Sequence, residues 1–220
     1  MTHAVLITHE YELQAIHRDL LQPNFPPHEL ISVEALVDLV ATGSGYVLVL
    51  PGNESYAGVA VVTFHAAQTD LLSFLAVDGT GRSKGYGSAL LAAVLHETAR
   101  RGRSFLLAEI AMPGTLSQQA EYGDVQRRAA FYARAGAKAL VVRHWLPYLG
   151  PKGEPVRLML LAIPTRAQDD WHVPTNQLRE FETSYHDGRS TPEVAATLSD
   201  LPGDGVVAVE DLRQAYHLSD

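Results

Sequence analysis

Short apolar runs bounded by turn residues alternate along this chain with segments whose apolar positions recur every three or four residues. The runs predict buried strands, and the recurring spacing predicts amphipathic helices. The expected strands lie at 4–7, 46–50, 57–64, 71–77, 105–111, 139–143, 156–162 and 206–209. The expected helices lie at 9–21, 33–40, 87–101, 125–135 and in the segment beyond 175. Strands and helices that intermix in this way predict an α/β (α+β) protein with a central bent mixed β-sheet flanked by helices on both faces.

The most informative stretch, 71–103, joins an expected strand to an expected helix through a glycine-rich basic loop. The first turn of a helix has backbone N–H groups without partners and the positive end of the helix dipole, so this loop predicts an anion site. Gly85 and Gly87 let a diphosphate approach the main chain because they carry no Cβ. Neither a P-loop nor a dinucleotide fingerprint fits the spacing of the glycines, and an ordinary strand-to-helix turn is the alternative.

The pattern R-x-x-G-x-G at 82–87, directly after a strand, resembles the pyrophosphate loop of the GNAT superfamily, the acetyl-CoA-dependent N-acetyltransferases. The segment 127–137 resembles a second signature of that family, an aromatic–tyrosine pair followed by a basic residue and a glycine. The resemblance implies a GNAT-like acyl-CoA N-acyltransferase fold, acetyl-CoA (coenzyme A) as acyl donor, and direct attack by an amine in a ternary complex. The chain departs from the family pattern at Gly79, Ser83, Val125 and Arg128.

The resemblance also implies roles for individual residues. Tyr132 aligns with the tyrosine that commonly acts as general acid, here toward the leaving thiolate. Backbone N–H groups near the end of the strand at 71–77 are expected to polarise the thioester carbonyl, in room that a splay from the next strand provides. Glu109 on that next strand is the expected base, because the attacking amine must be neutral. The expected cofactor-binding residues are Leu75, Ala76, Val77, Arg82, Ser83, Lys84, Gly85, Tyr86, Gly87 and Ser88.

These roles compete with structural ones. Tyr132 also fits a core aromatic side chain, and Glu109 also fits an ion pair with Arg127 or Arg128, or a solvated strand end. At the level of the whole protein, the alternative to an N-acetyltransferase is a non-catalytic acyl-CoA-binding or sensing module on the same fold.

Composition excludes several other classes. The 220 residues contain no cysteine, which rules out a disulfide framework, a thiol nucleophile and a cysteine-ligated zinc. The formal net charge of −8 disfavours non-specific nucleic-acid binding and suits cationic substrates such as amines. No metal site is expected, since the histidines show no paired ligand spacing, and His144 and Trp145 are expected to pack. No apolar segment is long enough for a membrane span, so a cytoplasmic protein without membrane or nucleic-acid partners is expected.

A boundary is expected at Pro164, between a GNAT-like domain at 1–164 and a mostly helical C-terminal extension at 165–220. Leu178, Phe181 and Tyr185 form an apolar helical stripe in the extension. The extension is expected to pack on the core, with a cap on the acceptor site or a subunit contact as further roles. The partners expected are an amine acceptor, either a small molecule or a peptide, and, from the family, a second copy of the chain.

Overall fold

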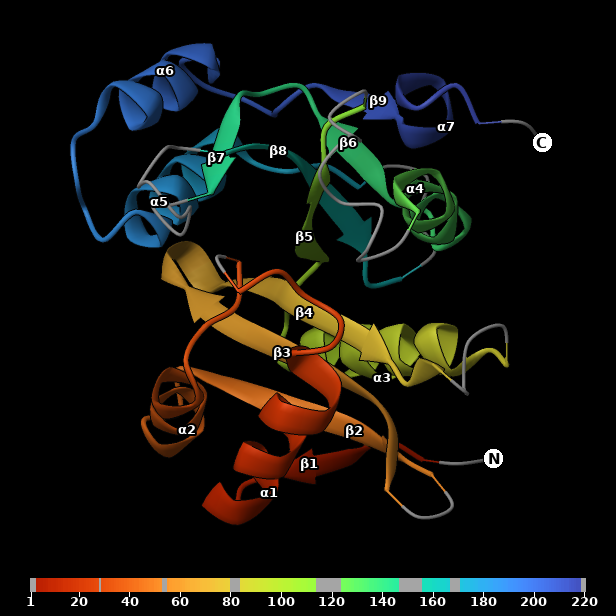
Figure 1. The fold of residues 1–220 in the computed structure, drawn as a ribbon. Helices are drawn as coiled ribbons and strands as arrows, with labels where there is room; N and C mark the ends of the chain where they lie inside the picture. Colours follow the sequence, from red (N-terminus) through yellow and green to blue (C-terminus); the bar gives the residue numbers. More distant parts are fainter. Residues whose placement is uncertain are drawn as a thin grey trace.

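The computed structural model describes residues 3–27, 29–52, 55–79, 84–113, 124–146, 156–166 and 171–218. Within these residues, nine strands form one open sheet in the order β1-β2-β3-β4-β5-β8-β6-β9, and β7 pairs with β8 beside this path (Figure 1). The strands are β1 (Val5–Ile7), β2 (Gly45–Pro51), β3 (Tyr56–His65), β4 (Thr69–Val77), β5 (Phe105–Ala111), β6 (Lys138–Leu140), β7 (His144–Leu146), β8 (Val156–Pro164) and β9 (Val209–Asp211). The helices are α1 (Glu10–Ile16), continued by a π-helical turn (His17–Leu21), α2 (Val33–Ala41), α3 (Tyr86–Arg100), α4 (Val125–Arg134), α5 (Thr175–Tyr185), α6 (Pro192–Asp200) and α7 (Leu212–Ala215).

The sheet is antiparallel except where β4 meets β5, which run parallel. In Figure 1 this contact divides the sheet into a lower half, β1 to β4, and an upper half that begins with β5. Helices cover both faces, so the prediction of a central mixed sheet flanked by helices is confirmed.

In the first half of the sheet, successive side chains alternate between the two faces, and each face contributes to a separate hydrophobic core. In β2, Val47 and Val49 pack with α1 and α2, whereas Leu48 and Leu50 pack on the opposite face with α3. Continuous apolar strands of this kind are the expected result of burial on both faces.

The second half follows the same rule. In β5, Leu106 and Ala108 pack in the core shared by α3, α4 and α7, while Phe105 and Leu107 face α5. Phe181 of α5 is fully buried in this second core, and helix α5 therefore packs directly on the sheet.

A β-bulge at Ser73 interrupts the alternation in β4. Val61 of β3 lies opposite Phe74, but the next residue, Val62, lies opposite Leu72, so Ser73 is the extra residue. Leu72 consequently faces the core that contains α3. Phe74, two residues later, points to the opposite face of the sheet because the bulge reverses the alternation from there on.

Side-chain caps mark the starts of α2, α4 and α6. Ser32 accepts a hydrogen bond from the backbone N–H of Ala35, Asp124 from Gln126, and Thr191 from Val194.

Two strand predictions are wrong in their limits. The run 139–143 forms a strand only as far as Leu140, and His144 begins a separate strand that pairs with β8. The run 206–209 makes one isolated bridge at Val206, and β9 begins only at Val209. No helix in the described part of the chain combines the length and the apolar character that a membrane span requires.

Candidate active site

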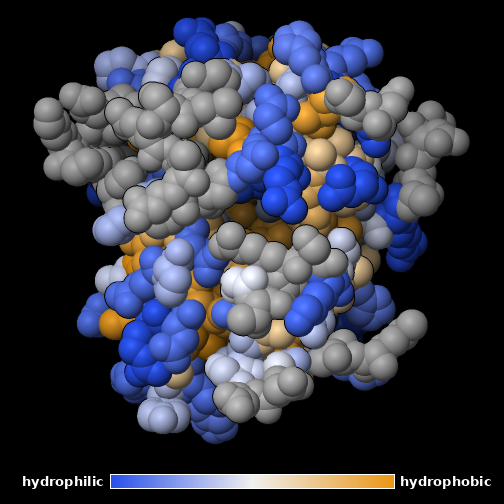
Figure 2. All heavy atoms as spheres, turned by 45° about the vertical axis from the view of Figure 1, so that its right-hand side comes forward, coloured by the Kyte–Doolittle hydropathy of each residue, from blue (hydrophilic) through white to orange (hydrophobic). Residues whose placement is uncertain are grey.

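A cavity opens where β4 and β5 separate. Their parallel pairing comprises Leu71 with Leu107 and Leu72 with Ala108. Beyond these pairs lies a cavity of about 530 Å³ that Leu75, Ala76 and Val77 line from β4. On this side of the molecule, Figure 2 shows an apolar hollow at mid-height with hydrophilic side chains around its rim. Among the described residues, no strand pairs with the backbone groups of β4 that point away from β3 beyond Leu72, which agrees with the predicted splay.

The N-terminus of α3 lies at one end of the cavity. Gly85 caps the helix in the left-handed region, with φ of +81°, and Gly85, Tyr86, Gly87 and Ser88 all line the cavity. A Cβ added to Gly85 would meet no heavy atom of the described residues within 4 Å, so none of them fills the space beside this helix end. Lys84 is exposed immediately before the cap, whereas Arg82 and Ser83 lie outside the described residues.

The first turn of α4 adds positive charge to the same cavity. Arg127 and Arg128 line it, together with Asp124, whose carboxylate caps the helix through the N–H groups of Gln126 and Arg127. The cavity thus has a cationic side that the second sequence motif supplies.

Tyr132 also lies on the cavity, one turn further along α4. Its side chain is 6% exposed, and burial raises the pKa of its hydroxyl to about 12, with Arg128 acting in the opposite direction. The hydroxyl is therefore a hydrogen-bond donor throughout the neutral range. Tyr132 is both a core aromatic, in edge-to-face contact with Phe131, and a polar group at the cavity wall.

Glu109 reaches the cavity from β5, on the face that turns toward α5. Its Oε1 accepts a hydrogen bond from the hydroxyl of Tyr185 at 2.5 Å and lies 2.5 Å from Nε2 of His144. Glu109 is therefore tied to His144 and Tyr185, and the alternative of an ion pair with Arg127 or Arg128 does not describe its contacts.

His144 is fully buried between two carboxylates. Its second ring nitrogen, Nδ1, lies 2.7 Å from Oε1 of Glu182, which is also fully buried. Burial by itself lowers the pKa of His144, but the charge of Glu182 and hydrogen bonds to both carboxylates outweigh it and raise this pKa to about 10. The ring is thus an imidazolium that donates one N–H to each carboxylate, which is more than the packing role expected from the sequence.

The sequence did not indicate Glu182 or Tyr185 as site residues, although it contained a signal for the first. Glu182 lies four residues after Leu178 and one after Phe181, so it is a charged residue inside the apolar stripe of α5. A buried carboxylate in such a position requires a partner. The loop after α1 supplies two further groups, Asn24 and Phe25, to the cavity.

Trp145 belongs to β7 and does not line this cavity, and 147–155 lie outside the described residues.

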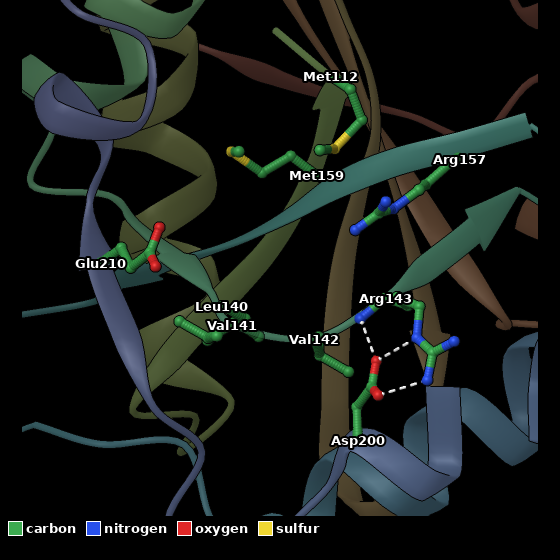
Figure 3. A pocket seen from close by; sticks show the side chains of 9 residues that line it. All are labelled: Met112, Leu140, Val141, Val142, Arg143, Arg157, Met159, Asp200 and Glu210. Carbon is green, nitrogen blue, oxygen red and sulfur yellow. Dashed lines mark hydrogen bonds and ion pairs between the residues drawn. The ribbon is translucent and has the colours of Figure 1, made fainter. Parts of the chain in front are cut away.

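A second cavity of about 480 Å³ lies over β6, β8 and β9 (Figure 3). Figure 3 shows the guanidinium of Arg143 against Asp200, where Nε and Nη2 donate to the two carboxylate oxygens at 2.7 and 2.6 Å. Arg157 and Glu210 also line it, so its charges are mixed. None of the predicted site residues that the structure describes lines this cavity, and the first cavity is therefore the candidate active site.

Comparison with known proteins places the fold. No protein-family model and no curated protein matches the sequence. Solved structures do match, and one is a Bacteroides thetaiotaomicron protein assigned to the GNAT family of acetyltransferases, with 19% identity and a TM-score of 0.57 over 73% of this chain and 86% of that one. The ribosomal-protein-S18-alanine N-acetyltransferase of Escherichia coli has 20% identity and a TM-score of 0.51 over 78% and 99%.

A Bacillus subtilis acetyltransferase in complex with CoA has 14% identity and a TM-score of 0.52 over 74% of this chain and 99% of that one. At identities this low, the structural match establishes the architecture alone. That architecture agrees with the one expected from the two sequence motifs. The chain therefore has the fold of the GNAT-family acetyltransferases.

Proposed function

We propose that the chain is a GNAT-type N-acetyltransferase that transfers an acetyl group from acetyl-CoA to an amine in a ternary complex. The observation that carries this proposal is that one cavity is lined by the N-terminus of α3, the unpaired edge of β4, Tyr132 and Glu109. The chemistry of acetyl transfer needs an anion site, a carbonyl-polarising donor, an acid and a base, and these four features correspond to those needs.

The residues present fit a coenzyme A diphosphate. The N–H groups of the first turn of α3 point out of the helix end, the side chain of the cap residue is absent, and Arg127 and Arg128 lie on the same cavity. A neighbour with this fold has been solved in complex with CoA, which supports the same use of the cavity here. Edge N–H groups at Leu75 to Val77 are the proposed donors to the thioester oxygen.

The protons balance over the whole reaction. Glu109 takes one proton from the ammonium form of the acceptor, directly or through a water molecule, and the neutral amine then attacks the thioester carbon. As the C–S bond breaks, Tyr132 donates its hydroxyl proton to the sulfur, and the tyrosinate recovers a proton from the amide nitrogen. One proton remains on Glu109 and is released to solvent before the next turnover.

The acceptor is proposed to approach from the side of Glu109, Asn24 and Phe25. Phe25 packs edge-to-face on Phe74 of β4 at 5.0 Å between ring centroids, which fixes the loop after α1 against the sheet. A carboxylate and an aromatic ring lining the same cavity suit a cationic amine. The candidate acceptors are small amines, antibiotics, amino acids, polyamines and protein N-termini or lysines.

The test uses the full chain in two measurements. Calorimetry with coenzyme A measures binding, and a thiol-release assay with acetyl-CoA measures transfer to each member of an amine panel that includes polyamines and N-terminal peptides. We expect binding and acceptor-dependent thiol release, with the acetylated amine detected by mass spectrometry. Binding without release for every acceptor would favour the sensing alternative, and absence of binding would refute the assignment of the cavity.

A further inference from the structure

A buried chain of hydrogen bonds links the C-terminal extension to the cavity. Glu182 of α5 contacts Nδ1 of His144, and Nε2 of His144 contacts Glu109, at 2.7 and 2.5 Å. His144 and Glu182 have fully buried side chains, whereas Glu109 is 12% exposed and lines the cavity. The only opening of this chain of three groups onto solvent, among the residues described, is therefore at Glu109.

The geometry leaves one oxygen of Glu109 for the acceptor. His144 and Tyr185 both contact Oε1. No hydrogen bond to Oε2 occurs among the described residues. A carboxylate held in this way is fixed in rotation, because two donors on separate elements, β7 and α5, hold one oxygen while the other stays available.

Charge explains why a second carboxylate matters. An imidazolium beside Glu109 alone would form a pair without net charge. Glu182 adds a second negative charge, so the three groups carry a net charge of −1 while His144 is charged.

Other polar groups surround His144 without replacing Glu182. The Nε2 atom of His186 lies 3.7 Å from Oε2 of Glu182, beyond hydrogen-bond distance. From β3, His65 packs on Tyr185 at 5.6 Å between ring centroids and hydrogen-bonds Thr63. Asp187 follows α5 and is the remaining charged group near His65.

We propose that His144 and Glu182 are positioning residues of the active site, through which the C-terminal extension keeps Glu109 oriented toward the cavity and able to accept the proton of the amine. This inference rests on the proposed function, since it assigns Glu109 a reaction to serve. It makes helix α5 a part of the catalytic apparatus as well as a part of the core.

The proposal is tested with Glu182→Gln, which keeps the shape of the side chain and removes its charge. The matched control is Glu180→Gln, on the exposed side of the same helix. We expect Glu182→Gln to lower kcat about tenfold or more and to move the acidic limb of the pH–rate profile to lower pH. KM for acetyl-CoA should stay within about twofold, because the coenzyme groups lie on α3 and α4, and Glu180→Gln should match the wild type.

A second measurement separates this proposal from the proposed function. In protein labelled with ¹⁵N-histidine, with His144→Gln used for assignment, we expect His144 to carry protons on both ring nitrogens at pH 8. In Glu182→Gln it should lose one of them at a pH at least about one unit lower. A neutral His144 at pH 7 in the wild type, the same titration in both proteins, or an unchanged kcat would each overturn the proposal.

The activity assay and the titration of His144 test the two proposals independently. A wild type that acetylates nothing refutes the proposed function and with it the catalytic use of the network, whereas the titration still decides whether Glu182 holds His144 as an imidazolium. A variant with normal titration but low kcat refutes the role of Glu182 and leaves the proposed function intact.

Discussion

Leu72 of β4 and Ala108 of β5 form the last parallel pair between the two halves of the sheet, and the candidate active site begins directly after them. The bulge at Ser73 follows Leu72 in β4, and Glu109 follows Ala108 in β5. The separation of β4 from β5 at this point thus leaves the backbone edge of β4 open to the cavity. It also places the proposed base, Glu109, on the facing strand.

A substitution at Gly85 tests whether the N-terminus of α3 is the anion site of the cavity. We expect Gly85→Val to weaken coenzyme A binding at least about tenfold in calorimetry, because a side chain would fill the space in front of the helix end. The control is Gly102→Val at the other end of α3, where φ is +80° and no heavy atom of the described residues lies within 4 Å of the Cβ position either. Both changes impose the same backbone strain, so equal affinity in the two variants would contradict the anion-site prediction.

A substitution at Tyr132 tests its proposed role as the general acid. Tyr132→Phe removes only the hydroxyl, and we expect kcat to fall about 100-fold with KM for acetyl-CoA nearly unchanged, since proton donation to the leaving sulfur is lost. The control is Tyr46→Phe, a buried tyrosine in the same core that is not part of the cavity lining. Steady-state kinetics decide the matter: activity that survives in Tyr132→Phe would leave Tyr132 with its packing role alone.

Phe181 tests whether the extension is part of the folding unit. Phe181 of α5 is fully buried against β5 and β8, so Phe181→Ala should lower the free energy of unfolding by about 3–5 kcal/mol. Tyr11→Ala, at a side chain that is 81% exposed, should change it little. Denaturant unfolding monitored by fluorescence and by circular dichroism gives the comparison. A separate early transition confined to the extension would show that 165–220 folds independently.

The buried network predicts a specific dependence of stability on pH. The pKa of His144 is raised, so its contribution is complete below its ordinary value of 6.5 and is lost as pH rises toward about 10. Burial by itself raises the pKa of Glu182, but the charge of His144, its hydrogen bond to Glu182 and the nearby His186 together lower it. The contribution of Glu182 is therefore present above its ordinary value of 4.5 and is lost as pH falls.

We therefore expect Glu182→Gln to cost about 3 kcal/mol between pH 5 and pH 6 and progressively less toward pH 10. Urea midpoints of the variant and the wild type, measured at several pH values, give this difference. A difference that stays constant over the whole range would mean that the charge of Glu182 does not stabilise the fold.

The local features of this chain were determined by its sequence. The strand, glycine loop and helix at 71–103 were predicted because each depends on neighbouring residues: an apolar run, a left-handed glycine and helical spacing. The caps at Ser32, Asp124 and Thr191 are local in the same sense, since a side chain bonds to a backbone N–H two or three residues away.

Tertiary structure decided the rest. The run after Lys138 stops being a strand at Leu140 because its pairing with β8 ends at Ala139 and its pairing with β9 ends at Leu140. No local pattern marks that point. Glu109, His144 and Glu182 are 35 and 38 residues apart in sequence, and they meet only because alternation in β5 turns Glu109 toward the face that α5 covers. Side-chain types and local geometry are encoded residue by residue, but which buried carboxylate faces which imidazole depends on how the sheet and the C-terminal helix pack together.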